Sequence, residues 1–548
     1  MLNNGRRFAI KTQKTILSAA FVLAVASGFN ALLGFAKGRL LATYFGDSID
    51  LAIFYTADRV PNLIYSVLVV GALSTVFIPV FTSLYKKNKE KAWDTASSMI
   101  NITLVFFFVL STIIYIFAPA VIKLLSVGQF NNDQIMMGVR LMRIMLGAQL
   151  VLVASSFLTS ILQSFKYFII PALAPIFYNV GFILGTVLLT KTYGIYGSAY
   201  GVVLGALLHL AIQIPMMRSA DFKFSLFSFS FHKNGTREVF ELMPSRIGSV
   251  LINNLISTVN NALAILISTS AVVHLKFANQ LQFFPVNIFG FSLAHASLPT
   301  LAEEGDDISL KKFKRTFITS FHQMMYLVIP VSIILLVLRV PVVRIVYGAS
   351  TFPWEATVKT SYALGFFSLS IFAQSGIYLV TRAFYALKDT STPVKVSTVT
   401  LLVNVLLSLL FVEYLHLGVW SIAFSFSITS ILTFITLMVL FSSKIGGLGF
   451  ERIVVPFTKI SYSAIFMGAG LYLPLKLLDQ FVFDTSRTVP LLMLTAVASL
   501  VGMTTYLFFT WVFKVEEIEL LFKLARKLKL NKEAATIATS TIGHREEI

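Results

Sequence analysis

The stretch FYALKDTSTPVK, residues 384–395, is a charged turn set between two long apolar runs. A second turn of the same design, ILQSFKYFIIP, lies at residues 161–171. The Lys and the Pro of the two turns stand at one common offset, since 388 − 166 = 222 and 393 − 171 = 222. A membrane chain that repeats itself in this way is predicted to hold two similar helix bundles, and a pair of facing bundles is the geometry of a transporter.

The composition is that of a membrane protein. Of the 548 residues, 56% are hydrophobic and 13% are charged, whereas a soluble domain is about a quarter charged. The net charge of +19 is carried by Lys and Arg in short loops between apolar runs, as the positive-inside rule expects. We therefore predict no nucleic-acid partner and expect these residues to suit anionic lipid headgroups. The absence of Cys excludes disulfides, thiolate metal sites and a Cys nucleophile.

Apolar runs long enough to cross a membrane recur along the whole chain. A span needs about 20 mainly apolar residues, and about fourteen segments meet this requirement. They are 15–36, 50–70, 97–122, 137–164, 169–190, 194–217, 240–268, 276–300, 317–346, 358–386, 394–413, 417–442, 454–477 and 487–513. The basic residues fall mainly in alternate loops, which predicts a multi-pass, all-α membrane protein with both termini in the cytoplasm.

The repeat also predicts how the chain is divided. We expect an N-terminal lobe at 1–217, a C-terminal lobe at 218–445, two added helices at 446–513 and a cytoplasmic tail at 514–548. Each lobe holds an even number of spans, so the two copies have the same orientation and their pseudo-symmetry axis runs along the membrane normal. Prolines within the spans are candidate bend points for switching between states. These prolines are Pro61, Pro79, Pro244 and Pro285.

Charged and amide side chains within the spans are candidates for a substrate site. A charge inside the bilayer costs roughly 2.5–3.5 kcal/mol, so it usually faces a cavity or a partner. The functional interpretation is a hydrated, basic central cavity for an anionic headgroup. Two other interpretations stay open, since Arg140 near the end of its span could snorkel to the interface and the Asn residues could bond between helices. The candidates are Lys37, Arg39, Asp58, Arg59, Asn62, Arg140, Arg143, Arg246, Asn279 and Gln280.

The repeated turns place further charges at the predicted inner mouth of the lobes. Lys166, Lys388, Asp389 and Pro393 lie there, and the two Lys either meet a substrate phosphate or only set the topology. No group of residues suggests covalent chemistry, and no phosphate-binding loop of the Gly-x4-Gly-Lys-Ser/Thr type is present. We therefore expect no enzyme, no metal and no cofactor, with the membrane potential or an ion gradient as the energy source.

Several stretches resemble the MurJ/MviN family of lipid II flippases. They are GFAKGRLLATYFG at 34–46, RVPNL at 59–63, GALSTVFIPV at 71–80 and the turn at 384–395. The resemblance is collinear from about residue 15 to 440. It implies the fold of the multidrug/oligosaccharidyl-lipid/polysaccharide exporter superfamily, with two six-helix lobes around a central cavity and two extra C-terminal helices.

The resemblance also implies a function. A protein of this family moves lipid II, the undecaprenyl-pyrophosphate-linked disaccharide pentapeptide, from the inner to the outer leaflet of the bacterial cytoplasmic membrane by alternating access. By position, Lys37 matches a cavity Arg of the family and Arg59 matches a basic position before Pro-Asn. The implied partners are the lipid-linked substrate, membrane lipids and, as candidates, cell-wall synthesis proteins.

Some charges of the family pattern are missing from this chain. In the first helix, Ala31 stands where the family pattern has an Arg. In the second helix, Ala52 replaces an acidic residue and Tyr65-Ser66 replaces an Arg pair. In the eighth helix, Asn279-Gln280 replaces an Asp-Arg pair. Either the other basic residues supply the charge, or the substrate differs. Two alternatives therefore stay open, namely an exporter of another undecaprenyl-linked glycan and a non-transporting family member that acts as a cell-wall scaffold.

Overall fold

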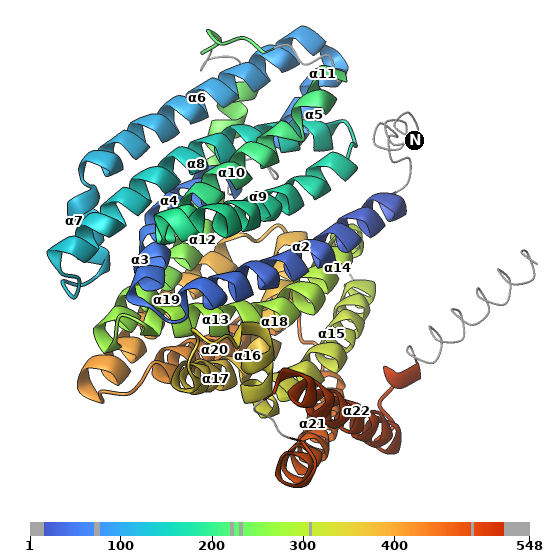
Figure 1. The fold of residues 1–548 in the computed structure, drawn as a ribbon. Helices are drawn as coiled ribbons and strands as arrows, with labels where there is room; N and C mark the ends of the chain where they lie inside the picture. The colour runs from blue at the N-terminus through green and yellow to red at the C-terminus, as the bar shows by residue number, and fades with distance from the viewer. Residues whose placement is uncertain are drawn as a thin grey trace, which may run out of the picture. The chain divides into compact units, whose positions relative to one another are not determined.

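The computed structural model describes residues 16–70, 77–219, 224–229, 234–305, 310–483 and 487–519. Side chains are described within these ranges except at 16–25, 70, 219, 234–247, 249 and 253. The described residues form helices joined by short turns, with no strand among them (Figure 1). This confirms the predicted all-α fold.

Ten helical segments within the described residues are long and apolar enough to cross a membrane. The count is eleven if α17 (Trp354–Ser368) and α18 (Ile371–Ala386), which are bent by 44°, form one span. The exact number of spans predicted from the sequence therefore remains a prediction. The expected spans at 50–70 and 276–300 are helical, but the structure divides each of them into shorter pieces.

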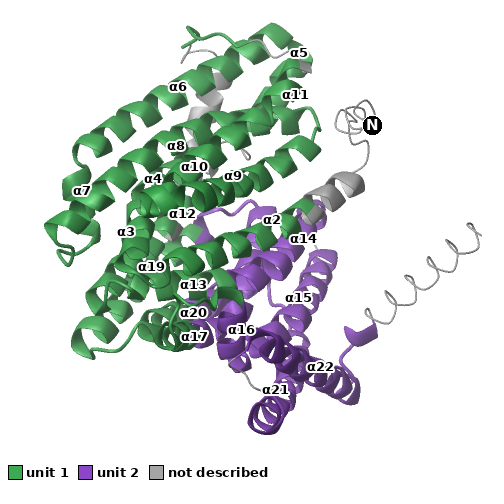
Figure 2. Cartoon of the chain, viewed as in Figure 1, with its two compact units in different colours: residues 1–281, 346–363, 394–429 green, residues 282–345, 364–393, 430–548 purple. Residues whose placement is uncertain are grey.

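The chain forms two compact units, which Figure 2 colours separately. The first unit comprises 1–281, 346–363 and 394–429, and the second comprises 282–345, 364–393 and 430–548. The lobe boundaries expected at 217 and 445 stay predictions. Helices that run from one unit into the other are α13 (Ala271–Pro285), α16 (Arg339–Tyr347), α17, α19 (Ser391–Leu409) and α20 (Trp420–Lys444).

The remaining helices belong to one unit each. Those of the first unit are α2 (Ile16–Phe45), α3 (Ile49–Ala57), α4 (Arg59–Tyr65), α5 (Ile78–Lys87), α6 (Lys89–Ile116), α7 (Ala118–Leu125), α8 (Asn132–Ser164), α9 (Ile169–Tyr193), α10 (Ile195–Ala211), α11 (Ile214–Ser219) and α12 (Asn234–Ile267). Those of the second are α14 (Ser292–Glu304), α15 (Lys311–Val337), α18, α21 (Phe450–Phe481) and α22 (Thr488–Val512). Among the described residues, π-helical turns lie at Ser66–Val70, Val286–Phe291 and Leu410–Tyr414.

The second expected span breaks next to its charged residues. Helix α3 ends at Ala57 and α4 begins at Arg59, with Asp58 between them. Pro61 explains the break, because proline has no amide N–H to donate to the carbonyl of Ala57 and its ring crowds that carbonyl. The π-helical turn Val286–Phe291 likewise follows a proline directly. Breaks of this kind free backbone groups and often occur at functional positions.

The two turns that repeat in the sequence have the same backbone conformation. Lys166 and Lys388 both have φ of 61°, a left-handed conformation that is uncommon for residues other than glycine. The amide of the next residue, Tyr167 or Asp389, donates to the carbonyl five residues earlier at 3.0 Å in both turns. The sequence repeat is therefore also a repeat of local structure.

Glycines allow α9 and α10 to lie in close contact. A Cβ atom added to Gly185 would overlap the Cα of Gly201, and one added to Gly181 would overlap the backbone of Gly205. Small residues spaced four apart are the usual means of close helix packing in membranes, where van der Waals contact replaces the hydrophobic effect. The glycine spacing of the sequence thus encodes the close contact of these two helices.

We expect Gly185→Ala to destabilise the protein by about 1–3 kcal/mol, because the new methyl group forces α9 and α10 apart. Thermal unfolding of the detergent-solubilised protein measures this effect. Gly147→Ala is the matched control, since a Cβ there meets nothing within 4 Å and alanine is the better helix former. Equal stability of the two variants would contradict the close-contact interpretation.

Candidate functional site

The break between α3 and α4 directs Arg59 toward α12. Its Nε donates to Oδ1 of Asn261 at 3.2 Å and its Nη1 donates to Oγ of Ser257 at 2.6 Å. The amide of Asn261 also donates to Oγ1 of Thr56 at 3.3 Å, which joins α3 to the same group. A guanidinium has five N–H donors, so these two bonds fix its direction and leave further donors for a bound anion.

A lysine from another helix lies in the same region. The Nζ of Lys37, on α2, is 4.7 Å from the ring centroid of Phe182 and 5.7 Å from that of Tyr178, both on α9. Aromatic faces attract cations, so the two rings hold the ammonium group in place. Asp58 lies close enough to interact electrostatically with Lys37 and Arg59.

Lys276 completes this group, although it was not among the candidate residues that the sequence suggested. It lies on α13, where its Nζ is 5.6 Å from the ring centroid of Tyr55, and it interacts electrostatically with Lys37, Asp58 and Arg59. The signal that could have found Lys276 is its place one helical turn before the Asn-Gln pair that replaces a charged pair of the family pattern.

We call Lys37, Asp58, Arg59 and Lys276 the basic cluster. It brings three cations and one carboxylate together, for a formal charge of 3 − 1 = +2. Its members come from α2, α4, α13 and the residue between α3 and α4. Charges in an apolar protein interior attract a counter-ion strongly, because the low dielectric screens them poorly. The cluster is therefore suited to an anion with about two negative charges.

Three further predicted residues lie near the cluster in the chain. Asn62 is exposed, and its amide lies 3.5 Å from a carboxylate oxygen of Asp58. Gln280 donates from Nε2 to the carbonyl of Gly34 at 2.8 Å and thereby joins α13 to α2. Asn279 is half-buried on α13. Gln280 thus has a packing role in this structure.

Two of the other predicted arginines have backbone carbonyls as partners. Arg39 is exposed and donates from Nη1 to the carbonyl of Val346 at 3.3 Å. Arg143 donates from Nε and Nη2 to the carbonyl of Tyr115, at 3.3 and 3.2 Å, and lies 4.3 Å from the ring of that residue. Arg140 is exposed on α8, and the side chain of Arg246 lies outside the described residues. The roles predicted for Arg39, Arg140, Arg143 and Arg246 stay predictions.

The repeated turn at 384–395 holds a compact polar network. The carboxylate of Asp389 accepts from the amides of Ser391 and Thr392 at 3.1 and 3.0 Å, and from Nζ of Lys444. Burial by itself would raise the pKa of Asp389, but the hydrogen bonds from Lys444 and Thr392 hold that pKa well below its usual value. Asp389 therefore fixes the start of α19 to the end of α20.

The other residues predicted at the inner mouth are less engaged in the fold. Lys166 and Lys388 are exposed, and Pro393 is buried in the first turn of α19. Their exposure is compatible with both of the roles that the sequence left open for the two lysines.

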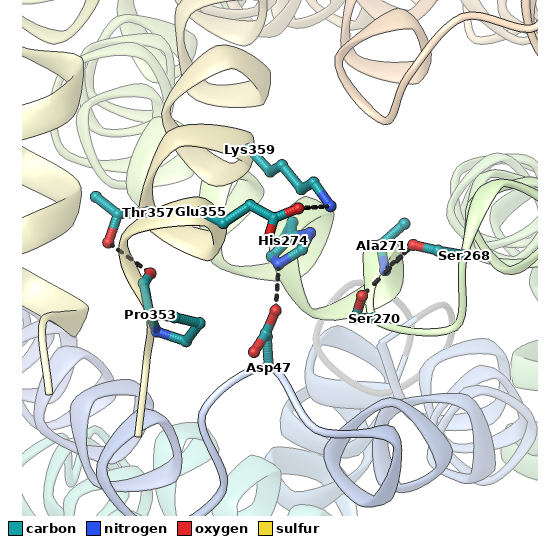
Figure 3. A network of polar contacts seen from close by, with 9 residues as sticks. All are labelled: Asp47, Ser268, Ser270, Ala271, His274, Pro353, Glu355, Thr357 and Lys359. Carbon is teal, nitrogen blue, oxygen red and sulfur yellow. Dashed lines mark hydrogen bonds and ion pairs between the residues drawn. The ribbon is translucent and has the colours of Figure 1, made fainter. Parts of the chain in front are cut away.

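A second polar group, which the sequence interpretation did not single out, surrounds the turn between α2 and α3 (Figure 3). The carboxylate of Asp47 lies 3.0 Å from Nε2 of His274 on α13. Oγ1 of Thr351 donates to the carbonyls of Ala42 and Thr43 at 2.7 and 2.8 Å. We call Asp47, His274 and Thr351 the clasp, because these bonds hold the turn to two segments that are distant in sequence.

We expect the clasp to give the protein a measurable dependence on acid. The hydrogen bond with His274 lowers the pKa of Asp47 below its ordinary value, although burial opposes this. A lowered pKa in the folded state stabilises the protein above the ordinary pKa, and this contribution is lost as the pH falls through the folded value. Asp47→Asn should therefore reduce the loss of thermal stability between about pH 5 and about pH 2, followed by unfolding in detergent.

Asp50→Asn serves as the control for this prediction. It removes a neighbouring carboxylate in the first turn of α3 and leaves the bond between Asp47 and His274 intact. If the two variants showed the same acid profile, the clasp would not be the origin of the effect.

Solved structures of membrane exporters share this fold. The chain is similar to an inward-facing multidrug resistance MATE family transporter of the MOP superfamily, with a TM-score of 0.64 and 13% sequence identity over 78% of this chain and 98% of that one. It is also similar to a structure of lipid II flippase MurJ in an inward closed conformation, with a TM-score of 0.75 and 22% identity over 91% of this chain and all (100%) of that one. The chain thus has the fold of these polytopic membrane proteins.

The family itself is shown by the sequence match. The profile of the family described as lipid II flippase MurJ matches residues 41–493. A probable lipid II flippase MurJ of Buchnera aphidicola is 28% identical over 412 residues, which cover 74% of this chain and 80% of that protein. One from Bdellovibrio bacteriovorus is 23% identical over 512 residues, 92% of this chain and 96% of that protein. The chain belongs to the MurJ lipid II flippase family, as its motifs predict.

Proposed function

We propose that the protein moves lipid II from the inner to the outer leaflet of the bacterial cytoplasmic membrane by alternating access. Family membership supports this proposal, since the relatives carry that name. The structural observation that carries it is the basic cluster, which gathers Lys37, Asp58, Arg59 and Lys276 from separate helices. The lipid tail stays in the bilayer, so only the headgroup needs a polar path.

The charge of the basic cluster matches the diphosphate of such a lipid. A diphosphate carries about two negative charges, and charge-assisted hydrogen bonds to phosphate are among the strongest in proteins. Arg59 is already oriented by Ser257 and Asn261, so it can bind phosphate oxygens with little loss of side-chain entropy. Lys37 and Lys276 add compact charges from two other helices. Asp58 moderates the repulsion among the cations when no anion is present.

Release toward the outer face is favoured by the membrane potential. Moving one negative charge outward across an inside-negative membrane is favourable by roughly 2.3 kcal/mol per 100 mV. The potential, or an ion gradient, is therefore the energy source we propose, with both termini in the cytoplasm. Cell-wall synthesis proteins are the proposed partners that supply or use the lipid.

Export of a different undecaprenyl-linked glycan is the second candidate function. The observation that favours it is that uncharged residues stand at positions where the family pattern has charged ones. Gln280 is engaged with the backbone of Gly34, and the hydroxyl of Tyr65 lies 2.9 Å from Oγ of Ser156, where the family pattern carries charges. The same losses also fit a non-transporting scaffold.

Complementation of a bacterial strain depleted of its own lipid II flippase tests these alternatives. We expect the full-length protein to restore growth and to expose labelled lipid II at the outer face of the membrane. A folded, membrane-inserted protein that restores neither would reject the leading proposal. Restored export of another undecaprenyl-linked glycan would support the second candidate.

Within a functional protein, Arg59→Ala should lower the rate of lipid II export by about 10- to 100-fold, because each charged hydrogen bond contributes about 1.5–3 kcal/mol. Arg59→Lys should be intermediate, since lysine retains the charge but loses the planar pair of donors. We expect Lys276→Ala to be impaired as well. Arg143→Ala is the matched control, because that arginine is bound to Tyr115. Similar export by the Arg59 and Arg143 variants would discard the basic cluster as the binding site.

A further inference from the structure

A short loop between α11 and α12 has its backbone fixed to α6. We call residues 224–229 the aromatic loop. The side-chain amide of Asn101 donates to the carbonyls of Ser225, Leu226 and Ser228 at 2.8, 3.0 and 3.0 Å. One buried side chain therefore contacts three carbonyl groups of the loop's backbone.

The serines of the aromatic loop face the same helix. Oγ of Ser228 lies 2.6 Å from Oγ of Ser98 and donates to the carboxylate of Asp94. The amide of Ser225 donates to Oγ of Ser97 at 3.1 Å. The contacts on α6 thus lie at 94, 97, 98 and 101, which is one face of a helix. The polar groups of the loop are turned inward and held there.

The apolar side chains of the aromatic loop are turned outward. Phe227 is 91% exposed, Leu226 is 68% exposed and Phe229 is 51% exposed. In water, exposing large apolar side chains while polar atoms are turned inward is unfavourable in free energy, because of the hydrophobic effect. A contiguous exposed apolar patch of this kind marks an interaction site.

The surroundings of the aromatic loop are those of a membrane surface. Lys86, Lys87, Lys89 and Lys91 are exposed at the end of α5 and the start of α6. Lys91 precedes Asp94, the first residue of α6 that contacts the loop, by one helical turn. Lysines beside exposed apolar side chains are typical of the boundary between acyl chains and water.

We propose that the aromatic loop inserts into the headgroup–acyl boundary of one leaflet and that the four lysines bind anionic headgroups there. Phe227, Leu226 and Phe229 enter the apolar layer, while the fixed backbone prevents the loop from folding back. Positive charge beside an apolar patch is the combination that attracts anionic lipid surfaces. The proposed topology would make this the inner leaflet, and only that assignment rests on the proposed function. Insertion of the loop does not depend on it.

The absence of Cys from the whole sequence makes a direct test possible. A single spin label is attached to Phe227→Cys in the full-length protein, reconstituted in liposomes that contain phosphatidylglycerol. Gln129→Cys, exposed in the turn between α7 and α8, is the control for the aqueous phase. Phe106→Cys is the control for the acyl layer, because Phe106 is 53% exposed on the apolar part of α6. Collision rates with oxygen and with a water-soluble nickel chelate report the depth of each label.

We expect the label at position 227 to resemble the Phe106→Cys label, with an oxygen-to-nickel collision ratio several-fold above that of Gln129→Cys. A ratio equal to that of Gln129→Cys would overturn the proposal. Shielding from both reagents in native membranes, but not in liposomes, would show that a protein covers the loop and would also overturn it.

A second measurement tests the role of the lysines. We expect the depth of the label at 227 to decrease when phosphatidylcholine alone replaces the anionic lipid, or when the four lysines are changed to Gln. No change in either case would reject the lysine contacts. These measurements do not depend on transport. If the protein fails complementation but its label at position 227 is exposed to lipid, the proposed function is rejected and the proposed insertion of the aromatic loop still stands.

Discussion

A guanidinium placed among apolar helices needs hydrogen-bond partners. In the first unit, the packing of α3, α4 and α12 depends on the partners of Arg59. Its partners Ser257 and Asn261 lie on α12, which must therefore pack beside α4. Asn261 also bonds to Thr56, so α3 is held to the same place. Without these partners, the charge of Arg59 would lie among apolar helices with no hydrogen bonds, which is costly.

The sequence predicts the parts of this structure that depend on local geometry. The turns at 161–171 and 384–395 are alike in sequence, and their lysines share a left-handed backbone, because a helix end is determined by its own few residues. Contacts between distant segments are not encoded in this way. Asp47 and His274 are 227 residues apart, and Arg143 binds a backbone carbonyl, a partner that has no sequence signature.

The basic cluster changes how the missing family charges should be understood. Position by position, the chain has lost several of them, yet Lys276 supplies a cation one helical turn from the Asn-Gln pair. A helix presents residues three apart on one face, so a charge can shift by one turn and remain in the same region. The total charge offered to an anion is therefore a better guide to the substrate than the identity of any single aligned position.

The close contact of α9 and α10 bears on the order of events during biosynthesis. Only Gly194 separates the two helices, and the glycines that join them are near in sequence, so the entropy lost on closing this hairpin is small. The partners of Arg59 on α12, by contrast, are synthesised about 200 residues later. The hairpin can thus assemble in the bilayer while Arg59 still lacks its partners, and it offers newly made helices a rigid wall on which to pack.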